Sequence, residues 1–440
     1  MRLLWVKAGK LLPVDTGGKI RSYNLLRHLA AQHDVTLLSY YGGRPDPAYD
    51  ADLTRHFPLA VTVNTGAPED SPIGIALDYG RRVLSPAPYA VTKFTSRRVS
   101  HLIKTWFRER RFDAAVCDFL SASLNFPATL STPSVLFQHN VESVLWRRQA
   151  AHEPNPVKRL AFTLEAAKMA RYERVTVRRF PHVIAVSERD RQDMIAMTEP
   201  SRLSVVPTGV DVDRYRAAAG VPARQPLLMF LGSMDWEANI DAVEYFCREI
   251  WPAILRAVPS ARFRIVGRNP HPRVLKLASD SVHVTGSVPS VVDHLREAAV
   301  FVVPLRVGGG TRLKIFEAMA AGKAVVSTTV GAEGLDVHDG RDIILADTPP
   351  RFADAVIDLL RDPDRRRGVE SAAAELAARF DWSVIARRFE AVLLRAIAAR
   401  SREIGSVVRS VIGSTSVPGS RDASEAIDAT KAPASSCGAG

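Results

Sequence analysis

The stretch VFVVPLRVGGGTRLKIFEAMAAGKAVVSTTVGAEGL, residues 300–335, joins two apolar runs through a glycine loop and a helix pattern. The first run, residues 300–305, predicts a buried strand that the glycines at 308–310 cannot continue. Thr311 offers an N-cap oxygen to the helix, Gly322 ends it, and the second run predicts another strand. Free backbone N–H groups and the helix dipole then point at one spot, so the stretch predicts an anion site.

Three cations, Arg306, Arg312 and Lys314, flank the loop, and a diphosphate suits such a spot. Glu317, about one and a half turns into the helix, is placed to receive a pair of hydroxyl groups. The alternative is that the triple glycine is only a loop and Glu317 a solvated helix residue. The stretch matches neither the phosphate loop GxxxxGK followed by Ser or Thr nor the fingerprint GxGxxG.

The length of 440 residues exceeds one ordinary core and predicts two domains with a tail. A hydrophobic content of 46% is typical of soluble globular proteins, and no apolar run approaches the roughly 20 residues that span a bilayer. The early Lys7 argues against the apolar region of a signal peptide. The cysteines at 117, 247 and 437 are widely spaced, which favours a reducing cytoplasm over a disulfide frame or a zinc site.

The net charge of +12 fits nucleic acid, an anionic membrane or phosphorylated substrates as partners, and equally a merely basic protein. The sequence contains no RNA-binding aromatic motif, finger spacing or basic heptad region, so we expect no nucleic-acid partner.

Residues 81–111 hold nine Lys or Arg and a single acid, Glu109. Five apolar residues within them recur at helical spacing: Val99, Leu102, Ile103, Trp106 and Phe107. A basic amphipathic helix of this kind lies on an anionic membrane, or packs its stripe into the core and leaves its charges in water. Both interpretations remain open at this point.

Strand and helix patterns alternate along the chain, which predicts a parallel-sheet α/β fold. The expected strands cover residues 2–8, 34–40, 60–64, 113–118, 133–138, 182–187, 202–206, 227–231, 262–266, 282–285, 300–305, 324–329 and 342–346. Ligands of such sheets bind at the carboxyl ends of strands. Gly17 and Gly18 follow the first strand, and His139 follows the strand at 133–138, so all three fall at that edge.

The run KIFEAMAAGKAVVSTTVGAEGL, residues 314–335, resembles the donor-binding signature of retaining GT-B glycosyltransferases of the family 4 type. Its glycine-rich start, GGGTRLKIFEAMA at 308–320, resembles a branch associated with exopolysaccharide, and PTGVDVDRY at 207–215 resembles the family's hinge segment. The resemblance covers most of residues 1–398. It implies the GT-B architecture, in which two doubly wound Rossmann-like domains face each other across a cleft.

The implied organisation has five parts. They are an acceptor-side domain at 1–205, a hinge at 206–225, a nucleotide-sugar domain at 226–380, a helix at 381–400 that crosses back to the first domain, and a tail at 401–440. The tail is rich in Ser, Gly, Ala and Pro, which predicts disorder.

The resemblance also implies roles for single residues. His139 takes the position of the active-site histidine, Gly17 and Gly18 face the donor phosphates, and Glu317 binds the ribose. The base lies between Arg268 and the Val288 backbone. Further donor-binding positions fall on Arg306, Gly309, Gly310, Thr311 and Leu313.

Two departures from the family pattern matter. Gly309 stands where the family has the glutamate that touches the donor sugar, and Ser233 and Asn239 replace an Arg and a Lys that grip the diphosphate. A diphosphate must still be neutralised in a partly dry cleft. We therefore expect Arg306, Arg312 and Lys314 to take over, with Arg312 and Lys314 acting on the leaving group during catalysis.

Together these features predict a retaining glycosyltransferase that moves a sugar from a nucleotide diphosphate to a hydroxyl of a glycan or lipid-linked acceptor. The expected setting is exopolysaccharide or cell-surface glycan synthesis in the cytoplasm or at the inner face of the plasma membrane. No cofactor besides the donor, and no metal, is implied. Two alternatives remain, a sugar-nucleotide epimerase of the same fold and a catalytically silent partner subunit.

Overall fold

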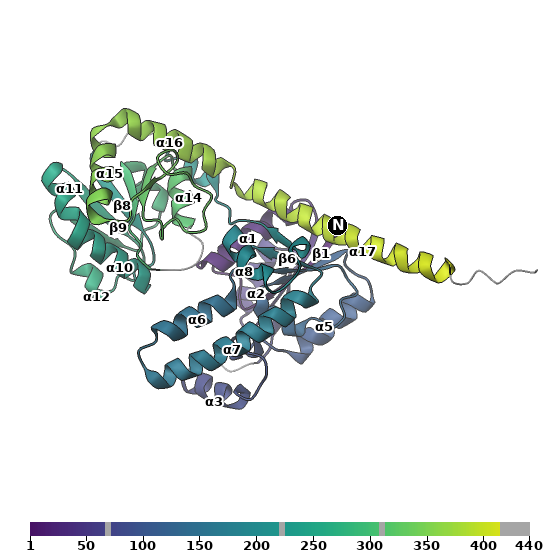
Figure 1. Ribbon diagram of the computed structural model, residues 1–440. Helices are drawn as coiled ribbons and strands as arrows, with labels where there is room; N and C mark the ends of the chain where they lie inside the picture. The colour runs from purple at the N-terminus through teal and green to yellow at the C-terminus, as the bar shows by residue number, and fades with distance from the viewer. Residues whose placement is uncertain (67–71, 220–224, 308–312, 414–440) are drawn as a thin grey trace, which may run out of the picture. The chain divides into compact units, whose positions relative to one another are not determined.

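A computed structural model describes residues 1–66, 72–219, 225–307 and 313–413. The chain divides into two units, Met1–Ile397 and Ala398–Gly440. The first unit contains both parallel β-sheets found in the described residues, each covered by helices (Figure 1). The predicted α/β class and the two Rossmann-like domains are confirmed.

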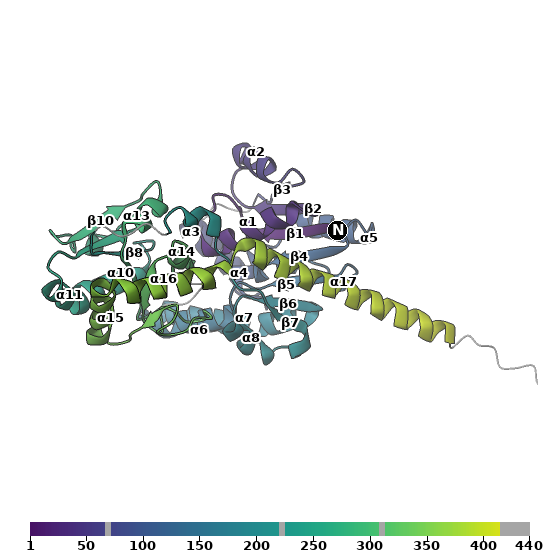
Figure 2. The ribbon, with the colours of Figure 1, turned by 90° about the horizontal axis from the view of Figure 1, so that it is seen from above.

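The N-terminal sheet has seven strands within the described residues, and all of them run parallel. They are β1 Arg2–Ala8, β2 Asp34–Tyr41, β3 Val61–Asn64, β4 Ala114–Asp118, β5 Ser134–Phe137, β6 His182–Ala185 and β7 Leu203–Val205. Their order is β3-β2-β1-β4-β5-β6-β7. Figure 2 shows β2 and β3 toward one edge, β6 and β7 toward the other, and β1, β4 and β5 between them.

The C-terminal sheet has six parallel strands among the residues described, in the order β10-β9-β8-β11-β12-β13. They are β8 Leu227–Leu231, β9 Arg262–Val266, β10 Val282–Gly286, β11 Val300–Val303, β12 Ala324–Ser327 and β13 Ile344–Leu345. All thirteen predicted strands are therefore present, and the central ones, such as β4, β5 and β11, are the fully buried runs that a parallel sheet requires.

The helices of the first half are α1 Gly17–Ala30, α2 Pro47–His56, α3 Pro72–Arg82, α4 Tyr89–Thr92, α5 Arg97–Arg108, α6 Glu142–His152, α7 Pro156–Arg179, α8 Glu188–Ile195 and α9 Val212–Arg216. Two short 3-10 helices are η1 Leu120–Asn125 and η2 Pro200–Arg202. The later helices are α10 Glu237–Tyr245, the π-helical turn η3 Phe246–Ile250, α11 Trp251–Ala257, α12 Pro272–Leu275, α13 Val291–Glu297, α14 Leu313–Ala320, α15 Pro349–Arg361, α16 Pro363–Ala378 and α17 Trp382–Gly413.

Alternate side chains of β1 enter two different cores, as the pleat of a strand requires. Leu3 and Trp5 pack on the face covered by α1, whereas Leu4 and Val6 pack on the opposite face. That second core also receives the apolar stripe of α5, since Val99, Ile103, Trp106 and Phe107 are buried there. Of the two interpretations of residues 81–111, core packing is the one that the structure shows for the stripe.

Two helix ends test the sequence patterns directly. Gly322, the predicted stop of the helix that carries Glu317, has a positive φ of 65°, and α14 ends just before it. The final helix, α17, continues to Gly413 instead of ending near residue 400, so the tail does not begin at residue 401 as predicted. Ile404, Val407, Val408 and Val411 continue the helical spacing of apolar residues, which explains the extension.

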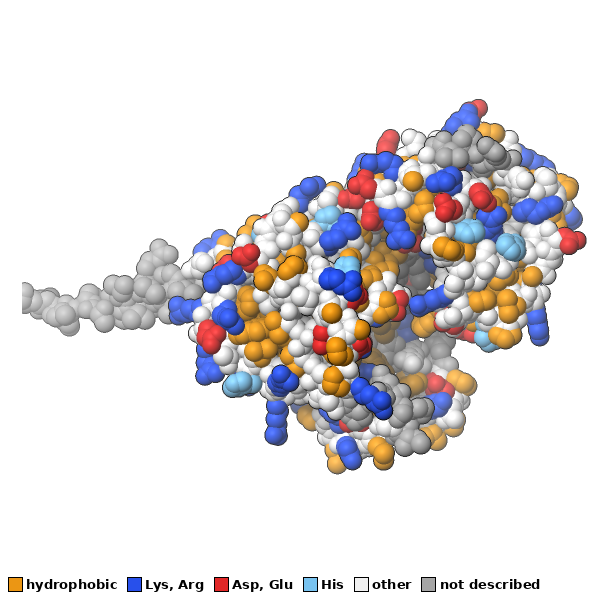
Figure 3. Space-filling view, turned by 180° about the vertical axis from the view of Figure 1, so that it is seen from behind, with side chains coloured by type: hydrophobic (Ala, Val, Ile, Leu, Met, Phe, Trp, Pro, Cys, Tyr) orange, Lys and Arg blue, Asp and Glu red, His pale blue; other side chains and the backbone are white. Residues whose placement is uncertain are grey.

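Figure 3 shows Lys and Arg side chains spread over one face and interspersed with acidic ones. Within the described residues, no helix combines the length and the apolar character that crossing a bilayer would demand.

Candidate active site

Three charged or titratable side chains meet at the carboxyl ends of β1, β4 and β5. Lys7 and Asp118 are register partners on neighbouring strands, and Lys7 Nζ lies 3.1 Å from Asp118 Oδ2. His139, two residues after β5, places Nε2 2.8 Å from Asp118 Oδ1. Trp5 Nε1 donates to Asp118 Oδ2 at 2.9 Å, and Lys7 Nζ donates to Ser22 Oγ at 3.2 Å. The Asp118 carboxylate is thus held on both oxygens within the sheet.

The protonation of this group follows from its burial. Burial alone raises the pKa of the Asp118 carboxyl, but Lys7 and His139 outweigh it and hold that pKa below its usual value. Burial lowers the pKa of His139 to about 4, although Asp118 pulls it upward. His139 is therefore neutral near pH 7. Because a carboxylate only accepts hydrogen bonds, Nε2 carries the proton and Nδ1 is left as an acceptor.

The Nδ1 atom of His139 is buried and has no hydrogen-bond partner among the described residues. A Cβ placed on Gly18 would lie 3.4 Å from this atom, whereas one on Gly17 would meet nothing within 4 Å. Of the two predicted glycines, Gly18 is the one that faces the histidine. The prediction that His139 and the glycine pair lie at one edge agrees with this geometry.

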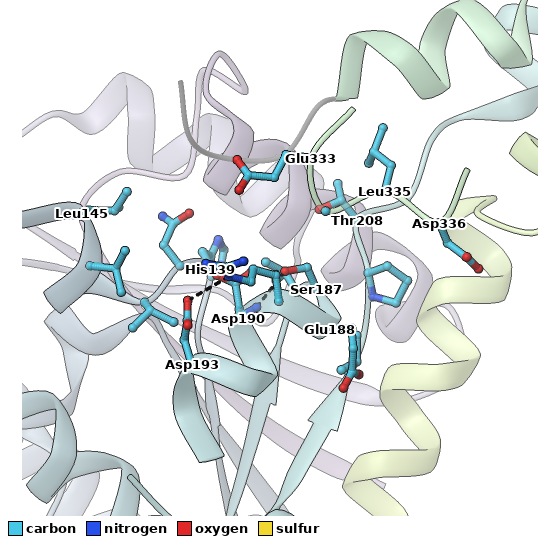
Figure 4. A pocket seen from close by; sticks show the side chains of 18 of the residues that line it. His139, Leu145, Ser187, Glu188, Asp190, Asp193, Thr208, Glu333, Leu335 and Asp336 are labelled. Carbon is cyan, nitrogen blue, oxygen red and sulfur yellow. Dashed lines mark hydrogen bonds and ion pairs between the residues drawn. The ribbon is translucent and has the colours of Figure 1, made fainter. Parts of the chain in front are cut away.

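His139 borders two cavities, one of about 610 Å³ and one of about 500 Å³. Ser187 and Asp190, which follow β6, line the larger one with His139 (Figure 4). The smaller one is lined by Lys7, Gly18, Phe119 and Glu142, among others. His139 therefore reaches ligand space on either side of its ring.

Sequence reasoning missed Lys7, Asp118 and Glu142 as site residues. The available signal for the first two was a charge at the end of an otherwise apolar strand, in LLWVKA and AAVCD. Glu142 lies in the first turn of α6, where an acid is ordinary, and Glu173 of α7 accepts from the backbone N–H groups of Glu142 and Ser143 at 2.8 and 3.0 Å. The helix start is thus capped from outside. Burial, reinforced by Glu173, raises the pKa of Glu142 to about 7.

Arg21 of α1 is a further buried charge that the sequence did not single out. Its Nε donates to Thr208 Oγ1 at 2.9 Å, and Thr208 also lines the larger cavity. Burial lowers the pKa of Arg21 to about 10, so the guanidinium stays charged at neutral pH. The positive charges of Arg21 and Lys7 also lower the pKa of His139, because nearby cations disfavour the charged imidazolium.

In the C-terminal sheet, cations gather at the carboxyl ends of the adjacent strands β9, β8 and β11. Lys314, in the first turn of α14, donates from Nζ to Asn239 Oδ1 at 2.8 Å and lies 4.3 Å from the centre of the Phe230 ring. Arg268, two residues after β9, donates from Nε to Ser233 Oγ at 3.0 Å. These contacts bring two cations to Ser233 and Asn239, the positions where the family pattern has an Arg and a Lys.

Arg306 takes a different place from Lys314. Its Nε and Nη2 lie 3.1 and 2.5 Å from the two carboxylate oxygens of Asp241, and its guanidinium lies 4.5 Å from the centre of the Tyr245 ring. The pKa of Arg306 is raised by this hydrogen bonding to Asp241. The structure therefore ties Arg306 to α10 and does not bring it to Asn239.

Glu317 is partly buried, and the Tyr215 hydroxyl of α9 hydrogen-bonds to it. Burial raises the pKa of Glu317, and the bond from Tyr215 opposes that rise. Leu313 and Val288 are partly buried. Four predicted site residues, Gly309, Gly310, Thr311 and Arg312, lie outside the described residues. The predicted contacts of these residues with a donor stay predictions.

Two parallel α/β domains with polar groups gathered at the carboxyl strand ends define the GT-B class of proteins. Solved structures show the same fold. Sucrose-phosphate synthase from Thermosynechococcus elongatus has a TM-score of 0.64 at 18% identity, covering 91% of this chain and 100% of that one. HepE of Anabaena, solved in complex with UDP, has a TM-score of 0.62 at 16% identity, covering 90% and 100%.

Family comparisons give the membership. Residues 16–214 match the family described as Glycosyltransferase Family 4, and residues 225–362 match the one described as Glycosyl transferases group 1. These ranges take in most of both domains, so the chain belongs to the family 4 type of glycosyltransferases.

Curated relatives match parts of the chain at higher sequence identity than these solved structures. A phosphatidyl-myo-inositol mannosyltransferase of Mycobacterium leprae is 29% identical over 191 residues, which cover 41% of this chain and 50% of the relative. A D-inositol 3-phosphate glycosyltransferase of Kineococcus radiotolerans is 28% identical over 272 residues, covering 53% and 61%. This chain therefore spans about half to three fifths of the length of these relatives.

Proposed function

We propose that the protein is a retaining glycosyltransferase that transfers a sugar from a nucleotide diphosphate to a hydroxyl group. The observation that carries this proposal is the pair of cations at the ends of β9, β8 and β11. Lys314 and Arg268 hydrogen-bond to the neutral side chains of Asn239 and Ser233, so two positive charges lie together at these strand ends, where they attract an anion. Family membership and the start of α14 beside Lys314 favour a diphosphate as that anion.

In the proposed reaction the bond between the sugar C1 and the diphosphate oxygen breaks while C1 bonds to the acceptor oxygen. Negative charge grows on the departing diphosphate, where Lys314 and Arg268 stabilise it. The acceptor proton passes to the leaving diphosphate oxygen, so the step needs no carboxylate nucleophile. Retention is inferred from the family signature at residues 314–335.

On the other domain, we assign the neutral His139 the task of orienting a sugar or acceptor hydroxyl. Its Nδ1 lone pair accepts a hydrogen bond, while Asp118 fixes the tautomer through Nε2. A charged imidazolium would lose that acceptor. The depressed pKa of His139 therefore supports this role at neutral pH.

As physiological setting we propose the synthesis of exopolysaccharide or another cell-surface glycan, with a glycan or lipid-linked acceptor. The glycine-rich start of the signature supports this branch. The curated relatives carry names of mannosyl- and glycosyltransferases that act on inositol-containing acceptors, which broadens the acceptors worth testing.

Nucleotide release from a panel of UDP-, GDP- and TDP-sugars, with and without a lipid extract, tests the proposal. We expect release that the extract accelerates, and a product whose anomeric proton coupling in NMR spectra matches the donor. An epimerase would instead give free nucleotide and an altered sugar without the extract. A silent partner subunit would release nothing from any donor, and either result would refute transfer by this chain.

A further inference from the structure

The long helix α7 exposes apolar side chains on the face directed away from the core. Val157, Leu160, Leu164 and Val175 are each more than half exposed, and their spacing of three, four and eleven residues places them along one stripe. From Val157 to Val175 the stripe covers 18 residue steps, about 27 Å at the helical rise. Large aliphatic side chains aligned over such a length on an outer surface indicate a partner.

The opposite face of α7 is already committed to the interior. Ala166, Met169, Thr176 and Val177 are buried there, and α6 packs along the helix through the ring contact between Trp146 and Phe162. The exposed stripe is therefore a second apolar face of a helix whose first face is in use. The hydrophobic core of the domain does not use this second face.

The charges around the stripe have one sign. Five basic side chains of α7 are exposed: Lys158, Arg159, Arg171, Arg174 and Arg178. Both acids of the helix, Glu165 and Glu173, are buried. In the described part of the chain, no ion pair involves any of the five exposed cations. The outer surface of α7 thus combines aliphatic groups with uncompensated positive charge.

The segment after α3 adds Leu84 to the stripe. Lys168 of α7, one turn after Leu164 on the same face, donates from Nζ to the Val83 carbonyl at 2.6 Å. Glu165 accepts from Tyr89 N at 2.6 Å. These bonds hold the segment after α3 against the middle of α7. Leu84, which follows Val83 in this segment, is 93% exposed, so another aliphatic group lies beside the stripe.

The neighbouring basic helix α5 differs on each of these points. Four residues of its apolar stripe are buried in the core, and the fifth, Leu102, is partly buried against it. Arg97 and Arg98 offer charge at its start but no exposed aliphatic groups beside it. A surface that needs both charge and apolar groups is therefore found on α7.

We propose that the outer face of α7, together with Leu84, docks on the surface of an anionic lipid bilayer. Aliphatic side chains enter the boundary between head groups and acyl chains, and the flanking Lys and Arg bind lipid phosphates. A helix of this length lies in the plane of the interface. The inference concerns attachment only and does not depend on the transfer reaction.

The test is co-sedimentation of the full chain with vesicles of phosphatidylcholine containing about one phosphatidylglycerol in three lipids, at low salt. Two double variants address the surface, Arg171→Glu with Arg174→Glu, and Leu160→Ser with Leu164→Ser. The matched controls are Arg97→Glu with Arg98→Glu on α5, and Leu59→Ser with Leu275→Ser. All eight positions are exposed, so thermal melting should match that of the wild type.

We expect the wild type to sediment and each α7 variant to lose at least about tenfold in partition coefficient, with losses below about threefold for the controls. A wild type that stays in the supernatant overturns the proposal. An α5 variant that loses as much as the α7 variant also overturns it. A third result would overturn it as well. If the wild type does not bind vesicles but forms a dimer in light scattering, and both α7 variants are monomers, the surface binds a second copy of the chain.

Discussion

The carboxyl strand ends of the two sheets carry charge in opposite ways. In the N-terminal sheet, Lys7, Asp118 and His139 are buried and satisfy one another before any ligand arrives. In the C-terminal sheet, Lys314 and Arg268 are partly or largely exposed and rest on neutral amide and hydroxyl groups. The first sheet end pairs its charges internally and leaves the Nδ1 lone pair of His139 for a ligand, whereas the second presents two cations on neutral side chains.

The contrast assigns different tasks to the two sites. A buried, mutually paired group is held rigidly and sets the protonation of His139, so it serves orientation. Exposed cations that hydrogen-bond to neutral groups attract an anion that binds between them. Mutations should therefore affect stability on the first sheet and ligand affinity on the second.

The largest effect expected is that of Asp118→Asn. The change leaves the Lys7 ammonium buried without its counter-charge and replaces one of the two acceptor oxygens, which serve His139 and Trp5, by an NH2 group. Breaking one partner of a buried ion pair costs about 3–5 kcal/mol of unfolding free energy. Urea denaturation followed by circular dichroism measures this loss.

Asp113→Asn is the matched control for that substitution. Asp113 pairs with Arg2 at 2.9 Å on the same two strands, but both side chains are more than one third exposed. An exposed pair contributes about 0–1 kcal/mol. Equal losses for both variants would mean that the Lys7–Asp118 pair is not sealed from water.

Glu142→Gln tests whether the N-terminal site also tunes a carboxyl group. The pKa of Glu142 is raised from 4.5 to about 7, so the native state binds more protons than the unfolded state between these values. Stability contributed by this group is present below pH 4.5 and is lost as the pH rises through 7. The variant should therefore exceed the wild type at pH 8 by about 1–3 kcal/mol and equal it near pH 4.5.

Denaturant unfolding at several pH values checks this slope. Glu188→Gln serves as the control, because Glu188 is exposed and hydrogen-bonds Arg191 and Gln192. A Glu142 variant with a pH-independent difference from the wild type would contradict the raised pKa of this carboxyl.

On the C-terminal sheet, Lys314→Ala should lower kcat/KM for the nucleotide sugar by more than about tenfold. The reason is the lost leaving-group cation at Asn239. Thermal stability should hardly change. The contact of Lys314 with Phe230 is worth about 0.5–1 kcal/mol, and a cation in the first turn of α14 costs a similar amount against the helix dipole.

Calorimetry with nucleoside diphosphate and with nucleoside separates charge from base recognition in that variant. The affinity for the diphosphate should fall and that for the nucleoside should not. Lys276→Ala, which removes an exposed lysine after α12, is the control. Full activity of the Lys314 variant would place the diphosphate elsewhere.

The strands were predictable because the central ones are apolar runs bounded by turn residues, and the positions of Gly18 and His139 followed from strand ends. Contacts between segments far apart in the sequence were not predictable. Lys7 and Asp118 are 111 residues apart, so the sequence shows two lone charges and no pair. The path of the chain after β11 decides which cation near the loop reaches Asn239. Lys314 bonds to Asn239, whereas Arg306 bonds to Asp241.

The exposed apolar surface of α7 could not be predicted from the sequence, for a related reason. Periodicity predicts one apolar face for each helix, and it correctly marked the stripe of α5. In α7 apolar residues occupy two opposite faces, so no single stripe stands out and only the fold shows which face is covered.

The smallest expected effect distinguishes the two glycines that open α1. Gly18→Ala places a methyl group about 3.4 Å from His139 Nδ1, which is ordinary contact and should leave stability unchanged. The methyl nevertheless occupies the space through which a hydroxyl would approach that lone pair, so we expect transfer to slow by about three- to tenfold, about 1 kcal/mol. Gly17→Ala meets nothing within 4 Å and should keep full activity while adding helix propensity at the same helix end. Steady-state kinetics on both variants decides the matter. If they behave alike, Nδ1 does not face the substrate, and the completed N-terminal site would support the fold alone.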